Sequence, residues 1–450
     1  MASAYLTKTF SSGGNQRIWT LSFWVKLNRG SGDDSYILTY AQSSGSNPRG
    51  EITFRSDANG NQFRVGFNPA GSSWTNCDVD TRKFRDYSAW YHAVVAVDTT
   101  QGTASNRVKI YINGEQQTVS TQPSQNFDTG FNHTHQQTYG RYENSDSSYL
   151  DGLLTHIHFI DGTQYSASDF GETDSTSGIW KPKTAPSVTY GTNGYFLNME
   201  NSSDFGEDSS GNNNDFTTSG TITQTEDTPS NNFATWNPLD NYYSQSTFSN
   251  GNTTQQTGNT EYGYSRATLG VSSGKWYWEV KLTTNHDTSL IGIASTQCTS
   301  TTNYLGANAN DYAYYYSGTY YNNGSASSYG NSYASGDIIG VALDLDNNKL
   351  YFSKNGTFQN SADPTSGATG TGAISITDPA STTDGFYFPS VGDFNNASNT
   401  YIFDGNFGNG RFGTTALASS NSDSAGLGLF EYSVPSGYYA LCTKNIKNYG

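Results

Sequence analysis

Hydrophobic and polar residues alternate with a period of two through most of the chain, which predicts β-strands and leaves few helical signals. The run VKIYING (108–114) places its three aliphatic residues on one face and ends in Asn113-Gly114. The run KLYFSKNG (349–356) places Leu350 and Phe352 on one face and ends in Asn355-Gly356. Asn-Gly after an alternating run is a strong signal for a two-residue hairpin turn. We therefore expect antiparallel hairpins with one buried face.

Asn59-Gly60 and Asp404-Gly405 predict two more turns of this kind. The two halves of the chain also echo each other: WTLSFWVKL at 19–27 resembles WYWEVKL at 276–282, and the segment 92–114 parallels 338–356. Two related β-sandwiches in tandem would explain the echo, and chance similarity between strands is the alternative. The fold class we expect is all-β, with two antiparallel jelly rolls.

The segment 201–233 contains no long alternation and is rich in turn residues. We take 201–235 as the connection between a first sandwich at 1–200 and a second at 236–450. Phe205, Phe216 and Phe233 could anchor this connection to its neighbours.

Composition and charge exclude several classes of function. Of 450 residues only 14% are charged, 33 are tyrosine, and the formal net charge is −16. Nucleic acid is not an expected partner, since phosphate contacts need clustered Lys and Arg. We expect no membrane insertion, because no run of 18 apolar residues exists. The start MASAYLTKTF lacks the apolar core of a secretory signal. An outward-facing protein without such a signal would reach the outside by another route, of which release by cell lysis as part of a virus particle is one.

Three widely spaced cysteines, Cys77, Cys298 and Cys442, form neither a disulfide framework nor a zinc motif. We expect partly buried free thiols.

The second half resembles a SPRY domain over roughly 236–446. The resemblance is carried by SSGKWYWEVKL (272–282), LIGIAS (290–295), SYASGDIIGVALDLDNNKLYFSKNG (332–356), FYFPSVG (386–392) and FGNGRF (407–412). The first half resembles a laminin-G-like or concanavalin-type jelly roll, through TLSFWVKL (20–27), WYHAVVAVD (90–98), VKIYING (108–114) and DGLLTHIHFIDG (151–162). Both families share a concanavalin-like sandwich, which agrees with the internal echo.

The whole arrangement resembles structural proteins of marine tailed bacteriophages, through FIDG (159–162), YGTNGYFLNMENSSDFGEDSSGNNNDF (190–216) and TPSNNFATWNPLD (228–240). The resemblance implies a virion protein, such as a tail fibre or another surface appendage. It also implies a location on the particle surface, contacts with other virion proteins and assembly as a homo-oligomer.

The segment 311–333 contains eight tyrosines in 23 residues. Tyr312, Tyr314 and Tyr316 would share one strand face, with Tyr315 on the other, so that one face belongs to the core. The end of the following hairpin is expected to be exposed, and rim loops of a rigid sandwich often bind ligands. The candidate contact residues are Tyr315, Tyr320, Tyr321, Asn322 and Asn323. The alternative is that these rings cover their own hairpin.

Catalytic and metal sites receive less support. The pair Glu172 and Asp174 lacks the third carboxylate of the Glu-x-Asp-x-x-Glu pattern found in concanavalin-like glucanases, so we expect no enzyme. His156 and His158 alternate and could hold zinc with His133 or His135, but we expect a pair of surface histidines.

Oxygen-rich turns at 57–62 and 207–215 keep calcium as a candidate ligand, although neither matches the twelve-residue calcium loop. We name no calcium ligands and no other cofactor. Trp276 and Trp278 could stack on a sugar, but their place on a strand beside Val280 favours the core.

The leading hypothesis is a non-enzymatic virion protein that contacts a host-surface glycan or a neighbouring virion protein. The alternatives are a glycan depolymerase on the tail, a capsid decoration protein and a bacterial lectin-like adhesin. Paired carboxylates on one strand would favour the depolymerase, and the sequence shows none.

Overall fold

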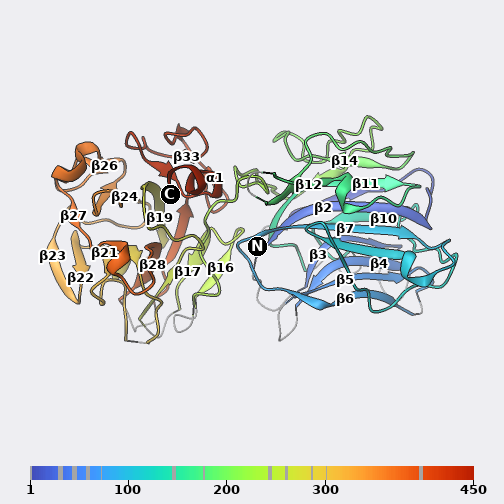
Figure 1. Cartoon of the computed structure of the whole chain (residues 1–450), viewed down its shortest axis with the longest axis horizontal. Coiled ribbons are helices and arrows are strands. Elements are labelled where there is room, and N and C mark those ends of the chain that lie inside the picture. The colour runs from blue at the N-terminus through green and yellow to red at the C-terminus, as the bar shows by residue number, and fades with distance from the viewer. Residues whose placement is uncertain are drawn as a thin grey trace. The chain divides into compact units, whose positions relative to one another are not determined.

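A computed structural model describes residues 3–28, 34–42, 48–56, 61–71, 73–143, 148–175, 178–241, 246–258, 262–284, 287–300, 302–394 and 399–450. The chain forms two compact units, Met1–Gln224 and Thr225–Gly450 (Figure 1). Within the described ranges, strands and turns dominate, with one α-helix, α1 (Thr443–Tyr449), and short 3-10 segments at Ala104–Asn106 (η1), Ala167–Asp169 (η2), Pro364–Thr369 (η3) and Pro379–Ser381 (η4). The predicted all-β fold class is confirmed. No described helix is long and apolar enough to cross a bilayer.

The first unit is a sandwich of two antiparallel sheets. One sheet has the order β15 (Thr217–Ser219), β1 (Tyr5–Lys8), β10 (Gln136–Tyr139), β3 (Ser35–Ala41), β4 (Arg49–Arg55), β5 (Asn61–Asn68) and β6 (Thr75–Phe84). The other has the order β14 (Tyr195–Leu197), β11 (Gly152–Asp161), β2 (Ile18–Leu27), β7 (Trp90–Asp98), β8 (Val108–Ile112) and β9 (Glu115–Gln117). A small hairpin, β12 (Gly171–Thr173) with β13 (Trp180–Pro182), lies outside them. One continuous core of aliphatic and aromatic residues from both sheets fills the sandwich.

The second unit repeats this architecture. Its larger sheet has the order β16 (Thr247–Ser249), β17 (Thr254–Gln256), β29 (Ile402–Asn406), β19 (Lys275–Thr284), β24 (Ile338–Asp344), β25 (Lys349–Lys354) and β26 (Thr357–Phe358), with β27 (Ile374–Ser375) on β25 and β34 (Tyr439–Ala440) on β19. Its other sheet has the order β18 (Gly263–Arg266), β28 (Phe388–Asp393), β20 (Ser289–Ala294), β21 (Asp311–Tyr315), β22 (Thr319–Asn322) and β23 (Ser325–Ser328). Two small hairpins complete it: β30 (Arg411–Phe412) with β31 (Thr415–Ala416), and β32 (Asn421–Ser422) with β33 (Leu429–Phe430).

The sequence echo corresponds to a shared topology. β2 pairs with β7, which pairs with β8, and all three are antiparallel. In the second unit β19, β24 and β25 pair in the same way. Trp276 and Trp278 on β19 are fully buried, which confirms that they belong to the core.

Two of the predicted hairpin turns are confirmed. Asn113-Gly114 and Asn355-Gly356 have φ values of 49°, 86°, 46° and 80°, and such left-handed pairs match the twist of a tight hairpin. The turn predicted at Asp404-Gly405 is wrong, because these residues lie inside β29, which pairs with both β17 and β19. A side chain at Gly405 would approach Phe407 and Trp236 within 2.9–3.0 Å, so this glycine makes room in a strand. Asn59-Gly60 lies outside the described residues.

The segment predicted as a connection is divided between the two units. β15 pairs with β1, and Phe216 belongs to the core of the first unit. Phe233 is fully buried in the second unit, where its backbone forms an isolated antiparallel β-bridge with Cys442. Each described sheet stays within one unit. The predicted domain bounds, 1–200, 201–235 and 236–450, stay a prediction.

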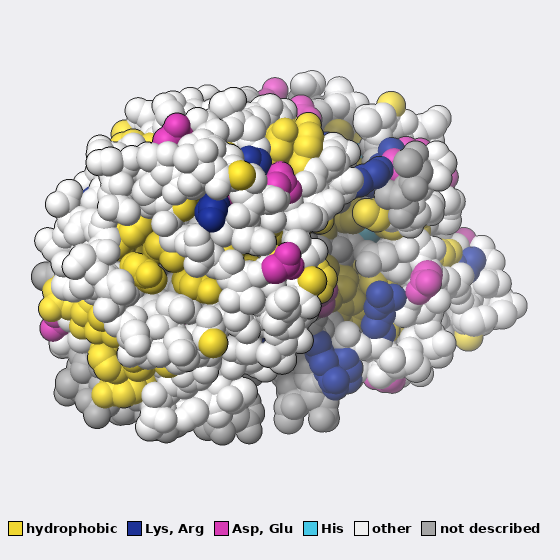
Figure 2. All heavy atoms as spheres, turned by 60° about the vertical axis from the view of Figure 1, so that its left-hand side comes forward, with side chains coloured by type: hydrophobic (Ala, Val, Ile, Leu, Met, Phe, Trp, Pro, Cys, Tyr) yellow, Lys and Arg dark blue, Asp and Glu magenta, His cyan; other side chains and the backbone are white. Residues whose placement is uncertain are grey.

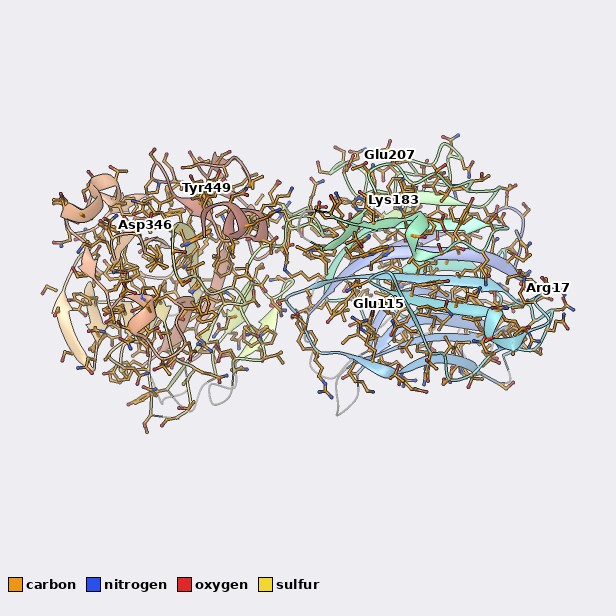
Figure 3. All side chains as sticks on the ribbon, in the orientation of Figure 1. Arg17, Glu115, Lys183, Glu207, Asp346 and Tyr449 are labelled. Carbon is orange, nitrogen blue, oxygen red and sulfur yellow. The ribbon has the colours of Figure 1, made fainter. Side chains whose placement is uncertain are left out.

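The C-terminal segment covers the second face of β19. Alternation points Tyr277 and Glu279 away from the tryptophans, yet both are buried, because residues 421–445 pack over them. The Glu279 carboxylate accepts hydrogen bonds from the backbone N–H groups of Glu431 and Tyr432, both at 2.9 Å, and from the Tyr277 hydroxyl at 3.1 Å. Tyr449, labelled in Figure 3, lies near the C-terminus. Its ring stacks on Tyr439, with ring centroids 3.7 Å apart.

Candidate binding surface

The tyrosine-rich segment forms β21 and the β22–β23 hairpin. Tyr312 and Tyr314 on β21 are buried in the core of the sandwich, and Tyr316 packs beside them. The Tyr314 ring stacks on Phe352 at 5.3 Å. The prediction that one face of this strand belongs to the core is therefore confirmed.

Tyr315 and Tyr321 lie on the opposite face of the sheet and form a cluster of rings with three residues from elsewhere in the unit. We call this the aromatic cluster; its members are Tyr262, Tyr304, Tyr315, Tyr321 and Phe394. Ring centroids lie 5.2 Å apart for Tyr315 and Tyr321, 5.7 Å for Tyr304 and Tyr321, and 4.1 Å for Tyr304 and Phe394. Tyr262 packs on Phe394 at 4.9 Å. All five are half-buried, so each ring packs against its neighbours and still presents some surface.

The prediction that Tyr320 and Tyr321 are exposed is wrong. Both are half-buried, because they alternate on β22 and each meets a different hydrophobic cluster. Tyr320 packs toward the sandwich core, with its ring 6.2 Å from Tyr329. Tyr321 is the one that joins the aromatic cluster, so these neighbouring tyrosines serve different faces of one sheet.

The remaining two candidate residues fix the position of the hairpin. The Asn322 side-chain amide donates to the carbonyls of Ala309 and Asp311 at 2.8 and 3.0 Å. The backbone N–H of Asn323 donates to the Asn308 carbonyl at 3.1 Å. Asn322 is thus committed to the fold, whereas the Asn323 side chain is exposed at the turn.

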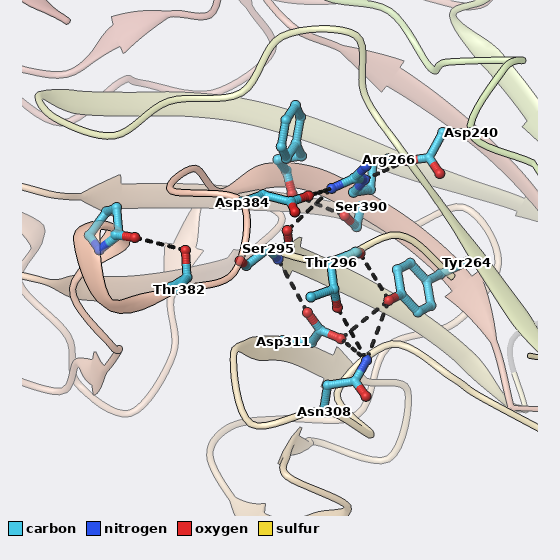
Figure 4. A network of polar contacts seen from close by, with 12 residues as sticks. Asp240, Tyr264, Arg266, Ser295, Thr296, Asn308, Asp311, Thr382, Asp384 and Ser390 are labelled. Carbon is cyan, nitrogen blue, oxygen red and sulfur yellow. Dashed lines mark hydrogen bonds and ion pairs between the residues drawn. The ribbon is translucent and has the colours of Figure 1, made fainter. Parts of the chain in front are cut away.

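A buried polar network lies close to the aromatic cluster, at the other end of β21 (Figure 4). The fully buried Asp311 accepts hydrogen bonds from the Asn308 amide at 2.6 Å, the Ser295 backbone N–H at 3.2 Å and the Tyr264 hydroxyl at 3.3 Å. Burial raises the pKa of Asp311, and these donors act against that rise. Because Asn308 also holds the turn of the hairpin, the network and the hairpin form one rigid arrangement.

The second half of this network is an ion cluster around Arg266. Its guanidinium contacts the carboxylates of Asp240 and, at 2.7 Å, Asp384, and it lies 4.4 Å from the centre of the Phe388 ring. The two carboxylates neutralise the charge of Arg266, so we assign its guanidinium a structural role.

The segment that carries Tyr315 and Tyr321 is free of charge, although the exposed Asp287 lies beside Tyr315, whose hydroxyl donates to the Asp287 carbonyl at 3.4 Å. Residues 312–336 contain no Asp, Glu, Lys, Arg or His. Burial raises the pKa of the Tyr315 phenol, which therefore stays a neutral donor. Figure 2 brings this end of the second unit forward and shows hydrophobic side chains among uncharged polar atoms, with few charges. Such a surface favours ring packing and hydrogen bonds over charge attraction.

The histidines of the first unit are not a surface pair, which corrects that prediction. His158 is only 2% exposed, stacks on Phe196 at 4.0 Å and shares a 2.8 Å hydrogen bond with the Tyr190 hydroxyl. Phe170, Trp180 and Tyr190 pack over this face of the sheet and help to bury it. His133 and His135 stack on each other at 4.1 Å. Among the described residues, no three His, Cys, Asp or Glu side chains gather in a way that could hold a metal.

The two carboxylates weighed as a catalytic pair both contact the same lysine. Lys181 Nζ lies 3.4 Å from Glu172 and 3.3 Å from Asp174, and these side chains are partly exposed. Glu172 lies on the small hairpin β12–β13, outside the two main sheets of this unit. The absence of enzymatic activity stays a prediction.

The oxygen-rich turn at 207–215 is held by hydrogen bonds of its own. The Asp208 carboxylate accepts from the backbone N–H groups of Phe196, Ser210 and Asn214 at 2.8–2.9 Å and from the Ser210 hydroxyl at 2.9 Å. These donors would compete with a cation for the same oxygens. In the other turn, residues 57–60 lie outside the described residues, so calcium binding stays a prediction.

Three members of the aromatic cluster could not be identified from the sequence. Tyr262 precedes β18, Tyr304 lies in the loop before β21, and Phe394 follows β28. No periodic pattern connects these positions, because the sheet order brings them together only after folding.

These features define a protein of two antiparallel β-sandwiches, the second of which carries a cluster of aromatic side chains on the outer face of one sheet. The family described as the concanavalin A-like lectin/glucanases superfamily matches residues 3–168, and the SPRY domain family matches residues 275–371. The chain therefore carries a concanavalin-like domain followed by a SPRY domain, which confirms both predicted domain types. No curated protein sequence matches the chain.

Solved structures resemble single parts of the chain. The SPRY domain of human HERC1 is 19% identical over 34% of this chain and 86% of its own, with a TM-score of 0.26. A heptameric pentraxin from Limulus polyphemus is 16% identical over 36% of this chain and 71% of its own, with a TM-score of 0.27. The enzymatically active domain of tailspike protein 2 from bacteriophage CBA120 is 13% identical over 36% of this chain and 25% of its own, with a TM-score of 0.29.

Proposed function

We propose that this chain is a non-enzymatic structural protein of a bacteriophage particle, displayed on the surface as a tail fibre or appendage, and that its aromatic cluster contacts a glycan of the host surface. The observation that carries the proposal is the aromatic cluster, a set of packed, half-buried rings, two of which lie on the charge-free segment 312–336. The proposed location is supported by the arrangement of the two domains and by the segments 159–162, 190–216 and 228–240, which resemble structural proteins of marine tailed phages. The concanavalin-like domain, whose family description names lectins, supports a carbohydrate-binding role.

The chemistry of the cluster suits an uncharged sugar. A tyrosine ring packs on the apolar face of a pyranose, while its hydroxyl can donate to or accept from sugar hydroxyls. The chain has a formal charge of −16, so it gains little from charge attraction to an acidic surface. Affinity must come from packing and hydrogen bonds, and many copies on one particle would supply avidity.

Two related roles remain as alternatives. A neighbouring virion protein could cover the aromatic cluster, as in a capsid decoration protein, and a free bacterial adhesin could use the same surface. A depolymerase receives less support, because Glu172 and Asp174 both pair with Lys181 and lie outside the main sheets. Release of reducing sugar from host polysaccharide, lost in Glu172→Gln, would favour the depolymerase.

The test compares two neighbouring tyrosines on β22. Tyr321→Ser removes a member of the aromatic cluster, whereas Tyr320→Ser removes a ring that packs on the opposite face. We expect Tyr321→Ser to lower binding to host cells and to isolated host polysaccharide at least about tenfold, and Tyr320→Ser to leave binding within about twofold. Circular dichroism of both variants controls for folding. Equal binding by both variants and the wild type would contradict a role for the cluster.

A further inference from the structure

β23 (Ser325–Ser328) is an open edge of the smaller sheet in the second unit. The sheet order ends at this strand, and all four of its residues are exposed. Figure 1 shows β23 at the outer margin of this unit, beside β22. An edge strand presents unpaired backbone groups, to which a strand of another chain can add.

The hairpin register identifies these groups. Asn322 pairs with Ser325 across the turn, Tyr321 with Ala326, Tyr320 with Ser327, and Thr319 with Ser328. Pairs that exchange hydrogen bonds alternate with pairs that do not, and a two-residue turn makes the Asn322–Ser325 pair hydrogen-bonded. The next pair beyond the strand agrees, since Tyr329 N–H donates to the Gly318 carbonyl. The N–H and C=O groups of Ala326 and Ser328 therefore point away from β22.

Nothing on this strand discourages pairing. Its sequence is Ser-Ala-Ser-Ser, and it lies in the charge-free segment 312–336. Natural edge strands are usually protected by charges, bulges or proline. In the first unit, the edge strand β6 follows that rule, with Asp78, Asp80, Arg82 and Lys83 along its length.

We infer that β23 pairs antiparallel with β23 of a second copy of this chain, and that the two smaller sheets join into one. A second copy fits because the strand is self-complementary: small neutral side chains oppose each other about a two-fold axis. Two copies with a net charge of −16 each repel one another, and at this edge no charged side chain of the segment 312–336 adds to that repulsion. The inference does not depend on the proposed virion role.

One register uses all the outward groups. If Ala326 faces Ser328 of the second copy, the two strands exchange four backbone hydrogen bonds, and Ser327 faces Ser327. The two Ser327 residues would not exchange backbone hydrogen bonds with each other, and the Cα atoms of such a pair lie about 4.5 Å apart. This spacing is within the range of a disulfide. The two Ala326 Cα atoms would instead lie about 8–9 Å apart, which is too far.

Cysteine cross-linking of the full chain tests the pairing and its register. We expect Ser327→Cys to form a disulfide-linked dimer under mild oxidation, and Ala326→Cys, exposed on the same strand, to remain largely uncrosslinked. The native thiols Cys77, Cys298 and Cys442 are buried, so they add little background. Equal cross-linking of both variants, or of neither, would overturn the inference.

Sedimentation of the uncrosslinked protein provides a second measurement. The interface is small, so a weak dimer is expected, and concentrations up to about 100 µM are needed. Ala326→Pro removes an outward N–H from each copy and leaves the ladder with β22 intact. We expect it to weaken dimerisation at least about tenfold. A wild-type chain that stays monomeric throughout this range, or a dimer that Ala326→Pro does not weaken, would contradict the proposed edge pairing.

Discussion

The buried carboxylate of Glu279 makes a quantitative prediction about pH. Burial raises its pKa from the ordinary 4.5 to about 7, against the hydrogen bonds donated by Glu431, Tyr432, Tyr277 and Asn406. A group whose pKa is raised on folding contributes most stability below its unfolded pKa and loses that contribution as the pH rises through the folded pKa. A rise from 4.5 to about 7 corresponds to about 3 kcal/mol.

Glu279→Gln isolates this contribution, because glutamine has the same shape and does not titrate. We expect the unfolding free energy of the wild type minus that of Glu279→Gln to fall by up to about 3 kcal/mol between pH 4.5 and pH 8. Urea unfolding, monitored by tryptophan fluorescence, measures this difference in free energy, with the transition of each unit fitted separately. A difference that stays flat or grows with pH would show instead that the four donors outweigh burial.

The same packing predicts a local effect. Glu279→Ala leaves buried donors without an acceptor, at about 1–3 kcal/mol each. Hydrogen exchange should show the amides of Glu431 and Tyr432 losing protection, whereas amides of the first unit should not change.

Three further predictions concern other residues. Burial lowers the pKa of His92 to about 3, so the first unit should lose stability as the pH falls below about 6.5, and this loss should shrink in His92→Gln. Gly130→Ala should destabilise by about 2 kcal/mol or more, because Gly130 has a φ of 82° and its added Cβ would meet the Tyr40 hydroxyl; Gly102→Ala, with open space around it, is the control in thermal unfolding. Burial raises the pKa of the Cys77 thiol to about 12, and all three thiols are buried, so a thiol reagent at pH 8 should label none of them before unfolding.

Local sequence patterns predicted much of the fold. The alternation in VKIYING and KLYFSKNG and their Asn-Gly turns were confirmed, because hairpins are specified by neighbouring residues. Tyr312 and Tyr314 were assigned to the core by the same alternation. Asp404-Gly405 shows the limit of this reasoning: pairing with strands on both sides overrode a local turn signal.

Contacts between distant segments were less predictable. Alternation alone points Glu279 outward, and residues about 150 positions later in the chain bury it. The aromatic cluster depends on the sheet order in the same way: Tyr315 and Tyr321 could be singled out, but Tyr262, Tyr304 and Phe394 could not. His158 was placed at the surface for the same reason, since nothing near it in sequence indicates the segment that covers it.

The proposed function requires that this chain be displayed on the surface of a phage particle. Electron microscopy of purified particles labelled with a gold-conjugated antibody against the chain tests it directly. We expect label at a regular place on each intact particle, and none on particles that lack the gene for this chain. Intact particles that carry no label, while the released protein is recognised by the same antibody, would contradict it.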